Sequence, residues 1–229
     1  SPEEKELTAY HETGHAMVSH FLPHAQTLRK VTIIPRGMAG GVTWYMDEDT
    51  SFLTRSKFKA MIATALGGRV AEEIVFGEIT TGASNDLQQV TRMARAMVTQ
   101  YGMSNELGLR VYGEKQELVF LGREISEQRD YSDAIAEQID AEVRRIIDEA
   151  HHLATEILTQ NRDKLDLISQ KLLEVETLEG AEFVALVEGK DVPTSAPSSG
   201  STRMSTPKTA ETGERPRPAL DLPPSPSPA

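Results

Sequence analysis

The 229-residue chain contains no cysteine, which excludes a disulfide framework, a thiol nucleophile and a cysteine-ligated metal. No run approaches about 18 apolar residues, so no segment is predicted to span a bilayer, and the N-terminus lacks the pattern of a signal peptide. Basic residues are scarce: 24 stand against 35 acidic ones, for a formal net charge of −11. Nucleic acids and anionic lipids favour clusters of Lys and Arg, so neither is predicted to be the main partner.

The last part of the chain differs in composition from the rest. Residues 191–229 contain 9 of the 12 prolines and are rich in Ser and Thr. Such a segment has too little apolar surface to offset its ordering entropy, so it is predicted to be a disordered tail. The part before it is long enough for a real core, and is interpreted as a catalytic part over 1–130 and a C-terminal helical part of the same domain over 131–190. The chain starts at Ser1 rather than at Met, which indicates a fragment or a processed product.

Hydrophobic spacing and turn residues predict a mainly α protein with one small sheet. Ser1, Pro2 and Glu4 form the pattern of a capping box at a helix start. The expected helices cover 2–21, 56–76 and 85–101, with amphipathic helices after Tyr131 and a last short helix capped by Thr177. The expected strands are 30–34 and 41–45, which form a hairpin, and a short strand near 118–121.

The segment His11-Glu12-Thr13-Gly14-His15 falls on the first predicted helix. Residues four apart lie on one side of a helix, so the two imidazoles can bind one Zn²⁺ at about 2.0–2.1 Å, while Glu12 reaches a metal-bound water. This is the H-E-x-x-H arrangement of zinc peptidases. The alternative is a pair of ordinary histidines. Gly14 makes this alternative less favoured. A glycine inside a helix lowers the stability of the helix by about 1 kcal/mol relative to alanine, which indicates that another group approaches closely there.

A catalytic zinc needs a third protein ligand, and its position is open from spacing alone. Val18 and Phe21 stand where a metzincin has Gly and His, which excludes that subclass. His20 and His24 fall on the opposite helix face and are interpreted as surface residues, as is the pair His151-His152 on a distant helix. The remaining candidates are carboxylates, either Glu72 or Glu73 after the Gly67-Gly68 pair, or Asp86 at the start of a helix, where an acid also satisfies backbone N–H groups.

Several segments, in order over roughly residues 1–190, resemble the peptidase domain of the FtsH family of membrane-anchored, ATP-dependent zinc proteases. The matching segments are Ala9-Tyr10-His11-Glu12-Thr13-Gly14-His15-Ala16, Val31-Thr32-Ile33-Ile34-Pro35-Arg36-Gly37, Gly67-Gly68-Arg69-Val70-Ala71-Glu72-Glu73-Ile74, Thr80-Thr81-Gly82-Ala83-Ser84-Asn85-Asp86-Leu87 and Tyr101-Gly102-Met103-Ser104, with Leu172-Leu173-Glu174 and Glu176-Thr177-Leu178 near the end.

The resemblance implies a helical zincin-type peptidase domain with a small β-sheet, followed by a C-terminal helical bundle. It implies His11, His15 and Asp86 as zinc ligands, Glu12 as the catalytic base, and Glu72 as a residue that holds a ligand imidazole in place. It further implies an endopeptidase that degrades unfolded, misassembled, tagged or regulatory proteins as a homohexamer.

The resemblance also implies parts that this sequence does not contain. ATP and Mg²⁺ would belong to an ATPase module, and the chain has no G-x-x-x-x-G-K-[ST] phosphate loop. The family's membrane anchor would precede this domain and place it on the cytoplasmic side. The chain is therefore expected to be the isolated protease portion, soluble by itself.

The segment Lys30–Ile34 follows the active helix and ends before a proline, as an edge strand can. We expect an extended substrate to pair with Val31, Thr32 and Ile33 through main-chain hydrogen bonds. A plain hairpin edge fits the sequence equally well. Two other functions also stay open: a self-standing thermolysin-like peptidase that uses Glu72 or Glu73, and an inactive zincin that serves as a helical binding module.

Overall fold

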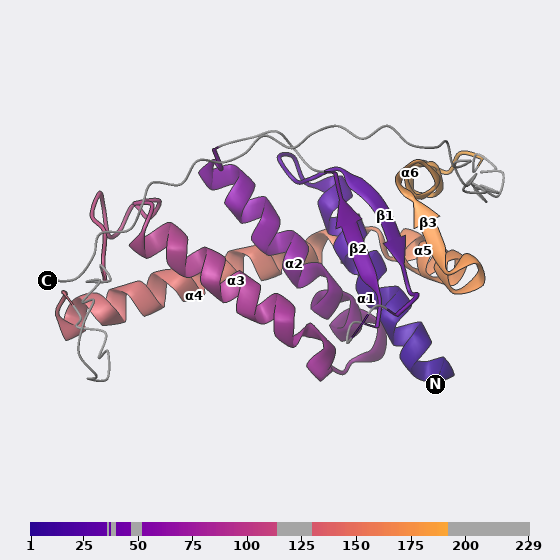
Figure 1. Ribbon diagram of the computed structural model, residues 1–229, viewed down its shortest axis with the longest axis horizontal. Helices are drawn as coiled ribbons and strands as arrows, with labels where there is room; N and C mark the ends of the chain where they lie inside the picture. The colour runs from indigo at the N-terminus through magenta and orange to yellow at the C-terminus, as the bar shows by residue number, and fades with distance from the viewer. Residues whose placement is uncertain (36, 38–39, 47–51, 114–129, 192–229) are drawn as a thin grey trace, which may run out of the picture. The chain divides into compact units, whose positions relative to one another are not determined.

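A computed structural model describes residues 1–35, 37, 40–46, 52–113 and 130–191. Six α-helices, one 3-10 turn and a three-stranded sheet form from these residues, as Figure 1 shows. The prediction of a mainly α fold with one small sheet is confirmed. The strand expected near 118–121 and the tail from residue 192 onward lie outside the described residues.

Helix α1 (Pro2–Phe21) begins where the capping box predicts. The Ser1 hydroxyl accepts from the Glu4 N–H, and the Glu4 carboxylate bonds the Ser1 nitrogen in return. The helix ends at Leu22, whose backbone is extended, directly before Pro23. This helix carries the H-E-x-x-H segment, and all its residues from Glu12 to Ser19 are buried.

The sheet has the order β2-β1-β3, built from β1 (Leu28–Thr32), β2 (Val42–Tyr45) and β3 (Thr177–Glu179). The predicted hairpin is confirmed: β1 and β2 pair antiparallel, with Val31 opposite Thr43. The cap predicted at Thr177 is wrong, because Thr177 begins β3. The last helix, α6 (Gly180–Glu188), is capped instead by Glu179 and Glu182.

The third strand also makes the predicted substrate edge wrong. β1 pairs with β2 on one side and with β3 on the other, with Val31 opposite Leu178 and Thr32 opposite Thr177. Beyond the strand, the Ile33 N–H donates to the Glu176 carbonyl at 3.0 Å. Since the main chain of Val31, Thr32 and Ile33 is engaged in the central strand and its extension, these residues have no free edge to offer a peptide.

Helices α2 (Arg55–Phe76) and α3 (Ser84–Thr99) agree with the predicted helices, with the start of each shifted by one residue. α3 ends at Thr99, two residues before the predicted end at Tyr101. Gly77 ends α2 in the left-handed conformation, as expected of a C-terminal glycine. A 3-10 turn, η1 (Thr81–Ala83), joins the two helices and leads directly into the first turn of α3.

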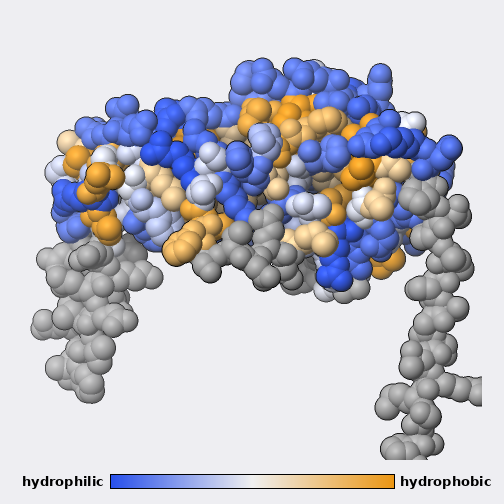
Figure 2. Space-filling model, turned by 90° about the horizontal axis from the view of Figure 1, so that it is seen from above, coloured by the Kyte–Doolittle hydropathy of each residue, from blue (hydrophilic) through white to orange (hydrophobic). Residues whose placement is uncertain are grey.

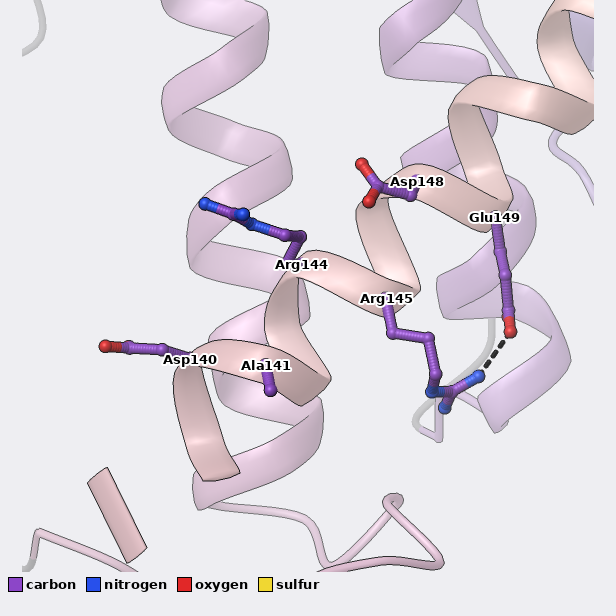
Figure 3. A pocket seen from close by; sticks show the side chains of 6 residues that line it. All are labelled: Asp140, Ala141, Arg144, Arg145, Asp148 and Glu149. Carbon is purple, nitrogen blue, oxygen red and sulfur yellow. Dashed lines mark hydrogen bonds and ion pairs between the residues drawn. The ribbon is translucent and has the colours of Figure 1, made fainter. Parts of the chain in front are cut away.

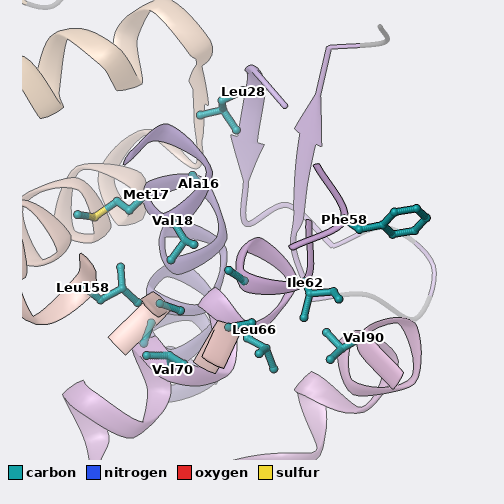
Figure 4. Packing of buried hydrophobic residues seen from close by; sticks show 14 of the residues in the cluster. Ala16, Met17, Val18, Leu28, Phe58, Ile62, Leu66, Val70, Val90 and Leu158 are labelled. Atoms are coloured by element: carbon teal, nitrogen blue, oxygen red, sulfur yellow. The ribbon is translucent and has the colours of Figure 1, made fainter. Parts of the chain in front are cut away.

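The long helices α4 (Asp133–Gln160) and α5 (Arg162–Val175) complete the fold. α4 packs on α1, α2 and α3, and α5 packs on α1. Figure 4 shows side chains from α1, α2, α3 and α4 meeting in one core, among them Val18, Ile62, Val90 and Leu158. Polar residues dominate the surface seen in Figure 2, with smaller hydrophobic areas between them. Within the described ranges, no helix has the length and apolar character needed to cross a bilayer.

Candidate metal centre

Two helices bring three side chains of types that can bind a metal to one point. His11 and His15 project from α1, and their Nε2 atoms lie 3.1 Å apart. Asp86, in the first turn of α3, places its Oδ2 at 3.3 Å from Nε2 of His11 and 3.5 Å from that of His15. The potential ligand atoms of the three residues all lie within 4.8 Å of one another. In the part of the chain that the structure describes, this is the only such group.

The outer nitrogens of both rings are held by the protein. Nδ1 of His11 lies 2.7 Å from Oε1 of Glu72, and because an ionised carboxylate only accepts, this nitrogen carries the hydrogen. Nδ1 of His15 lies 2.8 Å from the Thr64 carbonyl and donates to it for the same reason. The Gly68 N–H is 3.3 Å from that nitrogen, but a protonated nitrogen cannot accept. Both rings therefore turn Nε2 inward.

This arrangement favours positive charge at its centre. With both Nδ1 atoms protonated, two ring nitrogens and the Asp86 carboxylate are three acceptors facing one another, an arrangement that a proton or a cation among them would stabilise. Burial alone would lower the pKa of His11, but its hydrogen bonds to Asp86 and Glu72 outweigh burial and raise the pKa to about 9. Although burial opposes it, the two imidazoles hold the pKa of Asp86 well below its usual range.

Two glycines make room for the centre. A Cβ on Gly68 would lie 2.6 Å from Nε2 of both His11 and His15. A Cβ on Gly14 would lie 2.3 Å from the Gly67 carbonyl oxygen, so α1 and α2 touch through their backbones there. The close approach predicted at Gly14 and at the Gly67-Gly68 pair is confirmed.

Glu12 lies beside the three clustered residues but is not one of them. Its side chain is buried, and the Thr43 hydroxyl of β2 donates to its Oε2 at 2.6 Å. Tyr45 is two residues further along the same strand. Burial, together with the negative charges of Glu12 and Asp86, raises the pKa of its hydroxyl. Sequence reasoning missed Thr43 and Tyr45, because no local pattern connects a strand residue with a helix 31 positions earlier.

The two glutamates that competed with Asp86 have other partners. Glu72 is fully buried on the outer side of His11, and its second oxygen accepts from the Thr80 N–H at 2.9 Å. Glu73 bonds Arg69 at 3.0 Å and His151 at 2.9 Å. The expectation that His151 lies on a distant helix is therefore wrong, because α4 packs directly on α2. The expected exposure of His20 and His24 is confirmed.

A surface groove elsewhere carries none of these residues. It follows the outer face of α4 and is lined by Asp140, Ala141, Arg144, Arg145, Asp148 and Glu149. Figure 3 shows the charged side chains extending from one helix, with an ion pair between Arg145 and Glu149. Charged side chains at this spacing are typical of a solvated helix face.

Comparison with known proteins gives consistent results. The model of a family described as "Peptidase family M41" matches residues 1–186. A protein of Chloroflexus aggregans named "ATP-dependent zinc metalloprotease FtsH" is 60% identical over 188 residues, which are 80% of this chain and 29% of the relative. A Synechococcus protein of the same name is 52% identical over 196 residues, 84% of this chain and 31% of the relative. The chain thus spans about three tenths of the length of these relatives.

Proposed function

Because the chain belongs to peptidase family M41, we propose that it is the zinc-dependent endopeptidase part of an ATP-dependent protease. His11, His15 and Asp86 are the proposed zinc ligands, and Glu12 is the proposed catalytic base. The observation that carries the proposal is the convergence of the two Nε2 atoms and the Asp86 oxygen at 3.1, 3.3 and 3.5 Å, with Glu12 beside them.

The three residues suit zinc in chemistry and in spacing. Two neutral imidazoles and a carboxylate form a common donor set of catalytic zinc sites. Ligands of a tetrahedral zinc at about 2.0–2.1 Å stand roughly 3.3 Å from one another, close to the observed separations. The Glu72 carboxylate on Nδ1 of His11 is the kind of outer partner that orients a ligand imidazole and raises its basicity.

A zinc held by His11, His15 and Asp86 would supply two effects to the proposed reaction, a lowered pKa of a bound water and polarisation of the scissile carbonyl. Glu12 takes a proton from the attacking water and passes it to the departing amine nitrogen. The burial of Glu12 suits this role, because a carboxylate screened from bulk solvent exchanges its proton with groups in the site. No covalent intermediate with the protein forms.

A substrate in extended form is proposed to pair with β2. In the sheet that the described residues form, β2 is an outer strand and pairs with β1. It also carries Thr43, which contacts Glu12. A peptide added to this edge would lie beside the catalytic base, and main-chain pairing would tolerate many substrate sequences.

The proposal extends to the longer protein of which this chain would be a part. Relatives nearly three times as long are named ATP-dependent. We propose an ATPase module that binds ATP and Mg²⁺, a membrane anchor that places this domain on the cytoplasmic side, and assembly into a homohexamer. The substrates would be unfolded, misassembled, tagged or regulatory proteins. The same domain without an ATPase, and an inactive zincin used as a binding module, are the alternatives.

Metal analysis and hydrolysis together test the proposal. The purified chain, after incubation with zinc, should contain about one zinc by mass spectrometry and hydrolyse quenched fluorescent casein. Glu12→Gln should keep the zinc and lose about 10²- to 10⁴-fold in rate, the usual share of a general base. Glu6→Gln, the same change earlier on α1, is the matched control. A zinc-loaded wild type that leaves casein intact would favour the binding module, and a chain that stays empty would overturn the metal site.

A further inference from the structure

The hydroxyl of Thr43 and the carboxylate of Glu12 make one of the shortest hydrogen bonds at the site. Thr43 Oγ1 donates to Oε2 of Glu12 at 2.6 Å. We propose that Thr43 is a positioning residue that orients the Glu12 carboxylate for proton transfer. This inference rests on the proposed function, since it assigns a task to a residue that supports the catalytic base.

The carboxylate is the closer of two acceptors for the Thr43 hydroxyl. Its 2.6 Å distance lies at the short end of the range for hydroxyl-to-oxygen hydrogen bonds, about 2.5–3.0 Å. The second nearby acceptor is the Glu12 carbonyl, 3.1 Å from the same Thr43 oxygen. Because the hydroxyl has a single proton, the shorter bond to the carboxylate oxygen dominates. Both acceptors belong to Glu12, so the hydroxyl is directed to this one residue.

The geometry fixes one carboxylate oxygen and leaves the other. Oε2 is engaged by Thr43, and no described residue forms a hydrogen bond to Oε1. A glutamate side chain has three rotatable bonds and would otherwise sample several orientations beside the water. With Oε2 held, Oε1 remains as the oxygen that can accept the proton of the attacking water.

The sheet determines where Thr43 stands. Thr43 lies opposite Val31, which is fully buried in the core, and β1 is itself held by β3 on its other side. β2 contacts α1, the helix that carries Glu12, and Figure 1 shows the strand crossing in front of that helix. The position of the hydroxyl therefore depends on a rigid strand and not on a loop, as precise placement of a supporting group requires.

Gly41, which lies two residues before Thr43, also restrains the Glu12 side chain. A Cβ on Gly41 would lie 2.8 Å from Cγ of Glu12, from the Thr32 carbonyl oxygen and from Cγ2 of Thr8. The backbone of Gly41 thus packs on the stem of the Glu12 side chain, two residues before Thr43 bonds its carboxylate. Stem and carboxylate are both in contact with one short stretch of chain, which is the arrangement expected of a support for a catalytic side chain.

Three variants test the inference. Thr43→Val keeps the branched shape and removes the hydroxyl, and Thr43→Ser keeps the hydroxyl. Thr177→Val is the matched control. The Thr177 hydroxyl is also hydrogen-bonded within the sheet, at 2.8 Å to the Thr32 hydroxyl, but Thr177 lies on β3 and has no hydrogen bond to Glu12 among the described residues. Each zinc-loaded protein is assayed for kcat and KM with a quenched fluorescent peptide, for zinc content, and for its crystal structure.

We expect Thr43→Val to lose about 10- to 100-fold in kcat, the range typical of lost outer-shell partners, with unchanged KM and zinc content. Thr43→Ser should restore most of the rate, and Thr177→Val should match the wild type. In the crystal structure of Thr43→Val, the Glu12 carboxylate should be rotated away from its wild-type orientation.

The outcomes separate the inference from the proposed function. A Thr43→Val protein with wild-type kcat, or with Glu12 in the wild-type orientation, overturns the role of Thr43. An equal loss of rate in Thr43→Ser would also overturn it, because the hydroxyl would then not be the cause. A wild type that does not hydrolyse the peptide contradicts the proposed function, and the crystal structures still decide whether Thr43 orients Glu12.

Discussion

Gly14 on α1 and Gly67 on α2 meet without any side chain between them. A Cβ on Gly14 would lie 2.3 Å from the Gly67 carbonyl oxygen, and a Cβ on Gly67 would lie 2.6 Å from that of Gly14. Both separations are shorter than a carbon and an oxygen can tolerate, and the obstacles are backbone atoms that cannot turn aside. The crossing of the two helices, and with it the distance between the histidines and Glu72, depends on these two glycines.

Replacing Gly14 by Ala should therefore push the helices apart. Overpacking typically costs about 1–3 kcal/mol, against a gain of about 1 kcal/mol in helix propensity. We expect a lower free energy of unfolding in urea and weaker zinc binding. The control is Thr13→Ala on the same helix, which removes a buried hydroxyl without a hydrogen-bond partner among the described residues and should be milder. A Gly14→Ala protein as stable as the wild type would contradict the tight crossing.

Gly68→Ala should weaken metal binding more than folding. Its new Cβ would meet the imidazole edges of His11 and His15, and the rings could move away only by straining their hydrogen bonds to Glu72 and to the Thr64 carbonyl. In the metal-free protein, a loss of about 0.5–1.5 kcal/mol per strained bond should be offset in part by a gain of about 1 kcal/mol in helix propensity. Zinc affinity, measured by competition with a chelator, should fall by about 10- to 100-fold, as when the support of a ligand is lost. Unchanged affinity would show that the rings do not need this space.

Asp86 and Glu72 should differ in how much zinc binding they control. Asp86→Ala removes a proposed ligand and should abolish binding at micromolar zinc. Glu72→Gln removes only the charge that holds Nδ1 of His11, and should weaken binding by about 10- to 100-fold. The control is Glu73→Gln, because Glu73 is the neighbouring glutamate and its partners are Arg69 and His151, not a proposed ligand. If Glu72→Gln loses zinc completely while Asp86→Ala keeps it, Glu72 is the ligand and the assignment of Asp86 is wrong.

Glu142 on α4 should make stability depend on pH. Its carboxylate accepts from Arg145 at 2.6 and 2.8 Å and from Ser104 at 2.9 Å. The hydrogen bonds from Arg145, above all, lower its pKa from 4.5. Because the pKa of Glu142 is lower in the folded than in the unfolded protein, its ionised carboxylate stabilises the fold at pH values above 4.5. This stabilisation is lost as the pH falls through the folded-state pKa.

Glu142→Gln should accordingly lower the free energy of unfolding by roughly 1.5–3 kcal/mol at neutral pH, the range of hydrogen bonds to charged groups. The difference from the wild type should shrink in urea titrations carried out below pH 4.5. Glu149→Gln is the control, because Glu149 pairs with the same Arg145 but is about half exposed. Exposed pairs contribute little, so this variant should stay close to the wild type. If the free energies of unfolding of the wild type and Glu142→Gln differed by the same amount at every pH, the stabilising role of the ionised Glu142 carboxylate would be contradicted.

The local elements of this protein follow from its sequence. Ser1 and Glu4 predict the start of α1, and Gly77 predicts the end of α2, because capping contacts involve neighbours within one turn. The spacing of His11 and His15 likewise places two imidazoles on one helix face, whatever surrounds the helix. Hydrophobic periodicity predicts the long helices after Tyr131, because the apolar stripe of a helix is a local pattern that repeats every three or four residues.

The partners of these elements were decided only by the tertiary structure. The third strand at Thr177 escaped prediction because it is three residues long and pairs with Thr32, 145 positions away. That strand in turn makes β1 central and β2 an outer strand of the sheet formed by the described residues. Residue spacing also left Glu72 and Asp86 open, and only the family resemblance favoured Asp86. Both follow α1 by more than fifty residues. The crossing of α1 and α2 at Gly14 and Gly67 places Glu72 at Nδ1 of His11, and the packing of α3 places Asp86 at Nε2. Contacts over such distances depend on how whole helices pack, and no local pattern of residues records that.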